Sequence, residues 1–113
     1  MKITQTELAS MPLFVLEGEM DHASGDMVYP LIREALDEQA QIVLLDLQQV
    51  PYIDSGGLSV LVRTLHHLHQ EGWVGLIKPP QEVLWVLELS GLRRHPKLRV
   101  FPDQDAARAA LTG

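Results

Sequence analysis

The chain has no cysteine, no long apolar run and few basic residues, and each absence excludes a class of function. Without cysteine there is neither a disulfide framework nor a thiolate metal site. No apolar stretch approaches the roughly 20 residues that a membrane-spanning helix needs, and the first residues lack the apolar core of a signal peptide. We therefore expect a cytoplasmic protein with no membrane contact, no metal and no other cofactor.

Basic residues are outnumbered by acidic ones, at 9 against 15, which gives a formal net charge of -6. A nucleic-acid-binding surface needs a clustered basic face, so this charge argues against nucleic acid as a partner. The basic residues near Arg93 are interpreted as solvated charge beside a helix end. At 113 residues the chain is long enough for one core but not for two, so we expect a single domain over 1–113.

Short apolar segments alternate with helical patterns along the chain. Strands are expected at 3–8 and 13–17, joined as a hairpin through Ala9–Pro12. A first helix carries a stripe from Val28 to Leu36, but its start is open: Pro30 either lies in its first turn or kinks a longer helix. Further strands are expected at 42–47, 73–77 and 98–101, each followed by a helix, and the last helix spans 106–111 after a cap at Asp103.

This alternation predicts an α/β domain with a mixed, mainly parallel β-sheet and flanking helices. The opening hairpin supplies the antiparallel pair. In such sheets, function usually lies at the end where strands hand over to helices. Two loops, 18–24 and 52–57, lie at such handovers, so we expect them to share that end.

The second of these loops contains Asp54-Ser55-Gly56-Gly57 and opens the middle helix, which suggests three interpretations of Ser55. The serine caps the helix and nothing more; or it is a nucleophile, with His22 as the one histidine in reach and no Gly-x-Ser-x-Gly motif; or it accepts a phosphate in a binding surface. A helix N-terminus receives phosphate readily. Added charge beside Asp54 and Asp21 would change that surface without unfolding the domain.

The middle helix also has a face opposite its expected core stripe of Leu58, Leu61, Val62, Leu65 and Leu68. Gly56, Val60, Arg63 and His67 fall on this face, which is either a docking surface or an ordinary exposed face. Trp73 and Trp85 are expected to be in the core or half-buried. The histidines at 66, 67 and 69 are expected on a solvated helix end rather than in a metal site.

Three segments together resemble the anti-sigma factor antagonist family, the bacterial part of the STAS domains (sulfate transporter and anti-sigma factor antagonist). They are Gly18-Glu19-Met20-Asp21, the run from Ile42 through Asp54-Ser55-Gly56-Gly57-Leu58, and Leu89-Ser90-Gly91-Leu92. Their order and spacing cover nearly the whole chain, and the Asp-Ser-x-Gly-Leu segment is the most specific.

The resemblance implies a protein without catalysis of its own that works by partner switching. Family members bind an anti-sigma factor that is also a serine kinase; the kinase phosphorylates the antagonist and the complex dissociates, and a serine phosphatase resets it. Carried over by position, Ser55 is the phosphorylation site. The implied partner-binding residues are Asp21, His22, Asp54, Gly56, Gly57, Leu58 and Ser59.

The alternative is a constitutive STAS accessory subunit of a transporter or of a stressosome-type signalling assembly, in which Ser55 is only a helix cap. The sequence also departs from the family pattern. Gly56 replaces a second serine that many members have, Ser59 stands where glycine is common, and Pro30 is unusual in the first helix.

Overall fold

A tight hairpin begins the chain. In the computed structural model, which describes residues 1–112, β1 (Lys2–Leu8) and β2 (Met11–Glu17) are joined by the two-residue turn Ala9-Ser10. Both turn residues have positive φ, 50° and 68°, as a type I′ turn requires. The turn is shorter than the expected Ala9–Pro12 because Met11 and Pro12 already pair with β1.

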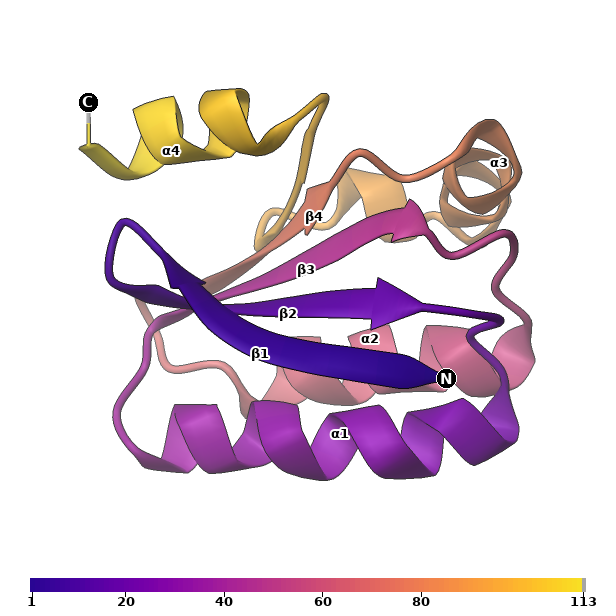
Figure 1. Ribbon diagram of the computed structural model, residues 1–113, viewed down its shortest axis with the longest axis horizontal. Helices are drawn as coiled ribbons and strands as arrows, with labels where there is room; N and C mark the ends of the chain where they lie inside the picture. The colour runs from indigo at the N-terminus through magenta and orange to yellow at the C-terminus, as the bar shows by residue number, and fades with distance from the viewer. Residues whose placement is uncertain (113) are drawn as a thin grey trace.

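The hairpin forms one side of a five-stranded sheet (Figure 1). The remaining elements are α1 (His22–Asp37), β3 (Ile42–Gln49), α2 (Ser55–His67), β4 (Trp73–Ile77), α3 (Gln81–Ser90), the 3-10 helix η1 (Leu92–Arg94), β5 (Leu98–Phe101) and α4 (Gln104–Thr112). The strand order is β1-β2-β3-β4-β5, with β1 antiparallel to β2 and every other pair parallel. The expected fold class is confirmed.

Helix α1 begins at His22, so a helix start near Tyr29 is wrong. A capping box fixes this earlier start: the Asp21 carboxylate accepts from the Ser24 N–H at 2.9 Å, and the Ser24 hydroxyl accepts from the Asp21 N–H at 2.8 Å. Pro30 lies inside the helix on its exposed side, where water can satisfy the backbone carbonyl that the proline leaves without a donor.

Alternate residues along the strands form two cores, one on each face of the sheet. Helices α1 and α2 cover the first face, where Ile32 and Leu61 share a cluster with Phe14 and Leu45. Helix α4 covers the second face, where Ala107 joins the cluster of Leu13, Leu44 and Trp73. Figure 1 shows α1 and α2 below the sheet and α4 above it.

Asp46 is a buried carboxylate on the second face of the sheet. It accepts from the Gln48 N–H at 3.0 Å and from the Gln104 side-chain amide at 2.9 Å. The second bond helps to fix α4, which has only Ala107 fully buried. The expected cap of α4 is confirmed, because the Asp103 carboxylate accepts from the Ala106 N–H at 2.8 Å. Within residues 1–112, no helix has the length and apolar character needed to cross a membrane.

Candidate binding surface at the start of α2

The loops that follow β2 and β3 are hydrogen-bonded to each other. Met20 forms an isolated parallel bridge with Ile53; its N–H donates to the Tyr52 carbonyl at 3.1 Å, and its carbonyl accepts from the Asp54 N–H at 3.2 Å. The expectation that the two loops share one end of the sheet is therefore confirmed. Asp21 and His22 follow directly on one side of this bridge, and Asp54 and Ser55 on the other.

The helix cap of α2 is Asp54, so the prediction that Ser55 caps this helix is wrong. The Asp54 backbone is extended, and its carboxylate oxygen Oδ1 accepts from the N–H groups of Gly56 at 2.8 Å and Gly57 at 3.1 Å. The carboxylate already satisfies both donors, because it stands one residue earlier than the serine. Ser55 is therefore the first residue of the helix, exposed to solvent, and its hydroxyl takes no part in the cap.

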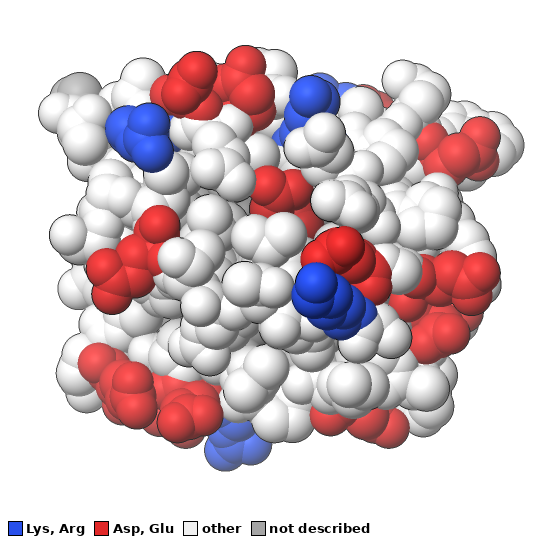
Figure 2. Space-filling view, in the orientation of Figure 1, with Lys and Arg blue, Asp and Glu red and all other residues white. Residues whose placement is uncertain are grey.

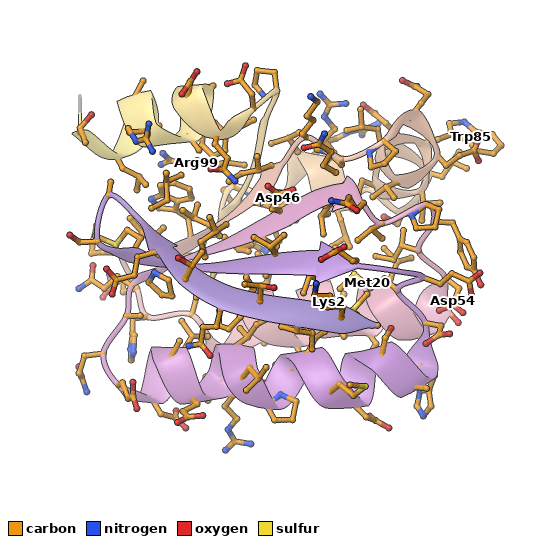
Figure 3. The ribbon with its side chains drawn as sticks, viewed as in Figure 1. Lys2, Met20, Asp46, Asp54, Trp85 and Arg99 are labelled. Atoms are coloured by element: carbon orange, nitrogen blue, oxygen red, sulfur yellow. The ribbon has the colours of Figure 1, made fainter. Side chains whose placement is uncertain are left out.

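Acidic groups gather around Tyr52 in the loop that leads to the exposed serine. We call Glu19, Asp21, Tyr52, Asp54 and Ser55 the Ser55 surface. The Tyr52 hydroxyl donates to Glu19 Oε2 at 3.1 Å, and this bond raises the pKa of Tyr52, as do the nearby charges of Glu19, Asp21 and Asp54. Figure 2 shows acidic and no basic side chains along the right margin of this view, where Figure 3 places Asp54. The surface is thus negatively charged before any modification.

The cap at Asp21 belongs to the same surface and stays ionised. Hydrogen bonds from the Ser24 N–H and the Ser24 hydroxyl lower the pKa of Asp21 below its ordinary value. Beside it lies a shallow hollow of about 260 Å³, lined by Met1, Glu19, Asp21, Ala23, Ser24 and Met27. Met27 is 52% exposed there, so an apolar side chain is accessible to solvent next to the acidic groups of Glu19 and Asp21.

Two glycines bring α2 close to the first residue of α1 and to the loop before it. A Cβ atom on Gly56 would lie 2.5 Å from both the N and the Cα of His22, and one on Gly57 would overlap the Met20 carbonyl oxygen. Gly56 is therefore required by packing, which explains why this chain lacks a serine there. Gly57 is buried, so its prediction as a partner-contacting residue is wrong. Leu58 is half-buried, whereas His22 and Ser59 are exposed.

The helix face proposed from the sequence as a docking surface is wrong, because α1 covers it. Val60 is fully buried and lies next to Gly25, and the Arg63 guanidinium stacks 4.4 Å from the centre of the Tyr29 ring. His67 Nε2 lies 2.9 Å from Asp37 Oδ1. The exposed stripe of α2 instead runs along Ser55, Ser59, Val62 and His66. Val62, expected in the core, is 36% exposed.

The expected solvated helix end is confirmed for His66 and His69, which are exposed, whereas His67 is half-buried. Besides the contact of His67 with Asp37, His69 Nε2 lies 3.0 Å from the Leu36 carbonyl oxygen, so both rings fasten α2 to the end of α1. In the part of the chain that the structure describes, no three His, Cys, Asp or Glu side chains are grouped to hold a metal ion. His22 Nε2 lies 4.0 Å from Asp26 Oδ2, and no hydrogen bond within residues 1–112 joins it to Ser55.

The two tryptophans differ in environment. Trp73 is 8% exposed and packs against Phe101 with ring centres 5.9 Å apart, as expected of a core residue. Trp85 is 59% exposed on α3, so its expected burial is wrong (Figure 3). Sequence reasoning missed this residue because α3 is apolar around most of its circumference, and its pattern does not show which side faces solvent.

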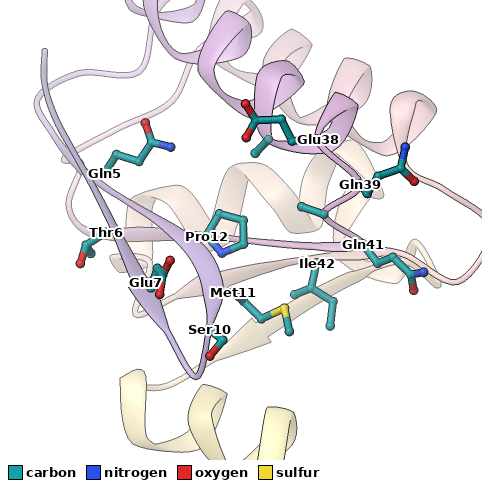
Figure 4. Close-up of a pocket in the computed structure, with 12 residues that line it drawn as sticks. Gln5, Thr6, Glu7, Ser10, Met11, Pro12, Glu38, Gln39, Gln41 and Ile42 are labelled. Atoms are coloured by element: carbon teal, nitrogen blue, oxygen red, sulfur yellow. The ribbon is translucent and has the colours of Figure 1, made fainter.

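A second hollow, larger than the one beside Asp21, lies at the other end of the sheet. It has a volume of about 630 Å³ and lies between the β1–β2 hairpin and the connection from α1 to β3 (Figure 4). Its lining is mixed and includes Gln5, Glu7, Glu38, Gln39 and Gln41. None of the predicted phosphorylation or partner-binding residues borders it.

Comparison with known proteins identifies the family of this chain. The sequence model of the STAS domain matches residues 2–107. The anti-sigma F factor antagonist of Paenibacillus polymyxa is 33% identical over 101 residues, covering 86% of this chain and 80% of that protein. BtrV of Bordetella bronchiseptica, assigned as an anti-sigma factor antagonist, is 29% identical over 111 residues, covering 97% of this chain and 91% of that protein.

Solved structures show the same fold. The anti-sigma factor antagonist SpoIIAA in its unphosphorylated form superposes with a TM-score of 0.80 at 18% identity, covering 97% of this chain and 96% of that one. The phosphorylated form of the Bacillus protein superposes with a TM-score of 0.74 at 18% identity, covering 96% and 99%. On the family match and the Paenibacillus relative together, this chain belongs to the STAS domain family, among proteins named as anti-sigma factor antagonists.

Proposed function

We propose that this protein is a cytoplasmic anti-sigma factor antagonist that acts by partner switching and has no catalytic activity of its own. It binds an anti-sigma factor that is also a serine kinase, and phosphorylation of Ser55 dissociates the complex. A serine phosphatase then restores the binding form. The observation that carries the proposal is the position of Ser55: it is exposed at the first turn of α2, and Asp54 has taken over its capping role.

The charge around Ser55 supports a switch that acts through electrostatics. A phosphate adds a charge of about −1.5 to −2 at neutral pH, and here it arrives beside Asp54 and close to Glu19 and Asp21. A partner that docks on this surface must match its charge, so the added charge changes the complementarity directly. A loss of about 2.8 kcal/mol in binding free energy lowers affinity about a hundredfold.

The partner surface that we propose is narrower than the sequence indicated. Asp21, His22, Asp54, Ser55 and Ser59 present exposed or half-exposed side chains there, and Gly56 and Leu58 are half-buried at its border. Gly57 has a structural role, because its lack of a side chain lets the start of α2 pack against Met20. That SpoIIAA has been solved in unphosphorylated and phosphorylated forms fits this assignment.

The test is to incubate the protein and ATP with the anti-sigma factor kinases of the same genome. Intact mass should increase by one phosphate with the partner kinase, and peptide mapping should place it on Ser55. Ser59 is the matched control, because it is exposed one turn later on the same stripe. Ser55→Ala should abolish the mass increase, whereas Ser59→Ala should still gain one phosphate on Ser55, whatever its effect on the affinity for the kinase.

A binding measurement separates the proposal from a constitutive role. Ser55→Asp should weaken the kinase complex about a hundredfold, whereas Ser55→Ala should bind like the unmodified chain. Equal binding by the two variants would contradict partner switching and would favour a fixed subunit of a larger assembly.

A further inference from the structure

Helix α3 carries an exposed apolar pair that the Ser55 surface does not include. Trp85 and Leu89 are 59% and 70% exposed, and their i, i+4 spacing places them together on one face of the helix. The opposite face of α3 is already anchored by Val83 and Leu87, both fully buried. A helix that is apolar on both sides is normally covered on both sides, but within residues 1–112 the outer face of α3 is left largely exposed.

The topology places this pair at the same end of the molecule as Ser55. Strands β3 and β4 are parallel neighbours, so α2 and α3 both start from the carboxyl end of the sheet. Figure 3 shows Trp85 and Asp54 along the same margin of the molecule. Tyr52, 40% exposed in the loop before α2, adds an aromatic ring to this end. The exposed apolar pair on α3 and the acidic Ser55 surface, to which Tyr52 belongs, therefore lie at the same end of the molecule.

We infer that Trp85 and Leu89 form the apolar half of the surface that binds the anti-sigma factor, and that the Ser55 surface forms its switchable half. The inference rests on the proposed function. Tryptophan is prominent among residues that dominate binding energy, because a large rigid ring buries much area at low entropic cost. In this arrangement α3 contributes to the affinity for the anti-sigma factor whether or not Ser55 is phosphorylated. The phosphate on Ser55 then lowers that affinity by repulsion at the Ser55 surface.

Charge indicates which partner covers the pair. Glu82 and Glu88 flank Trp85 and Leu89 on α3, and Glu88 already pairs with Arg93 at 2.9 Å. A second copy would bring another chain of net charge -6 against this acidic end, which charge repulsion opposes. A protein with an apolar pocket and a basic rim fits both α3 and the Ser55 surface, and one such protein can contact both.

Fluorine NMR provides a direct test. The chain is labelled with 5-fluorotryptophan, which gives one signal for exposed Trp85 and one for buried Trp73, and the unlabelled kinase that phosphorylates Ser55 is added with ADP. The Trp85 signal should shift and the Trp73 signal should not. A Trp85 signal that stays unchanged on kinase binding would overturn the inference, as would one that shifts with the concentration of the labelled chain alone, because the cover would then be a second copy.

Variants measure what the pair contributes. Trp85→Gln and Leu89→Gln should each weaken kinase binding, by about thirtyfold for the tryptophan, while Gln5→Ala on the distant strand β1 should not. Circular dichroism checks that the variants remain folded. Binding within twofold of the unmodified chain in both α3 variants, together with a normal effect of Ser55→Asp, overturns this inference and leaves the proposed function standing. If no kinase binds the unmodified chain, the proposed function fails and this inference with it.

Discussion

At the residue scale, Asp54 caps α2 and Ser55 is the proposed phosphorylation site, so two adjacent residues perform two roles that a single serine could have combined. Asp54 accepts both N–H bonds at the start of α2, so Asp54→Ala should lower the free energy of unfolding by about 1 kcal/mol. Asp54→Asn should retain most of the stability, because an asparagine oxygen caps nearly as well. Urea denaturation monitored by circular dichroism gives these values.

Ser55→Ala is the matched control for this comparison. Because the serine hydroxyl is not the cap, its removal should change the free energy of unfolding by less than about 0.5 kcal/mol. A loss for Ser55→Ala as large as that for Asp54→Ala would contradict the assignment of the cap. It would also weaken the case that Ser55 is available for phosphorylation.

Gly56 supports a second prediction at this scale, since it stands where relatives were expected to have serine. Gly56→Ser should destabilise this chain by about 1–3 kcal/mol, because the new Cβ meets the backbone of His22 at 2.5 Å and backbone cannot rotate away. Thermal and urea unfolding measure the loss, with Ser59→Ala as the exposed control on the same helix. A neutral Gly56→Ser would mean that α1 and α2 separate easily at this end.

At the scale of elements, the start of α1 should respond to acid. Hydrogen bonds from Ser24 lower the pKa of Asp21 in the folded protein, so its stabilising effect is present above the unfolded value of about 3.9 and is lost as pH falls through the folded value. In Asp21→Asn the group cannot titrate. The difference in unfolding free energy between the unmodified chain and this variant should be constant from about pH 7 to pH 5.

Below about pH 4 that difference should move in favour of the asparagine variant. His67 lowers the pKa of Asp37 at the other end of α1, but this effect is common to both proteins and cancels in the difference. Urea titrations at each pH provide the measurement. Parallel pH profiles for the two proteins would show that Asp21 is not held by the capping box.

The strands and the order of the elements were predictable from the sequence, because their signals are local. Strand β4 is observed at the expected 73–77, and Gly91 ends α3 with a φ of 80° as a left-handed cap. The start of α1 was open because Pro30 is a strong local signal against a helix, whereas the capping box at Asp21 and the burial of Val28 and Ile32 in the core together outweigh it. Helix propensities of single residues do not account for the competition between Pro30 and the interactions that favour the earlier start.

The errors at the candidate site have one physical cause: they depended on which neighbour covers a helix face. Val60 is small and apolar on a face that periodicity marked as free, and the close approach of Gly25 shows that α1 packs there. Trp85 is the opposite case, an apolar residue with no neighbour on its outer side. The identity of the capping residue at α2 likewise depended on backbone angles that two adjacent polar residues, Asp54 and Ser55, left undetermined.

At the scale of the whole molecule, a phosphate on Ser55 should change the surface and leave the fold intact. Ser55 is exposed at the start of a helix whose anchors, Val60, Leu61 and Leu65, lie deeper in the core, and the helix dipole tolerates added negative charge there. The melting temperature of the phosphorylated chain should therefore stay within a few degrees of the unmodified value. Differential scanning calorimetry measures this shift.

Backbone amide spectra should localise the effect to one end of the sheet. Signals should move in the two connections bridged by Met20 and Ile53 and at the first turns of α1 and α2. Those of β5 and α4 should not move, because they belong to the core on the other face of the sheet or to its far edge. Shifts throughout the sheet, or a melting temperature lowered by tens of degrees, would indicate a conformational switch. In that case, electrostatic repulsion at the docking surface would no longer explain how the partner is released.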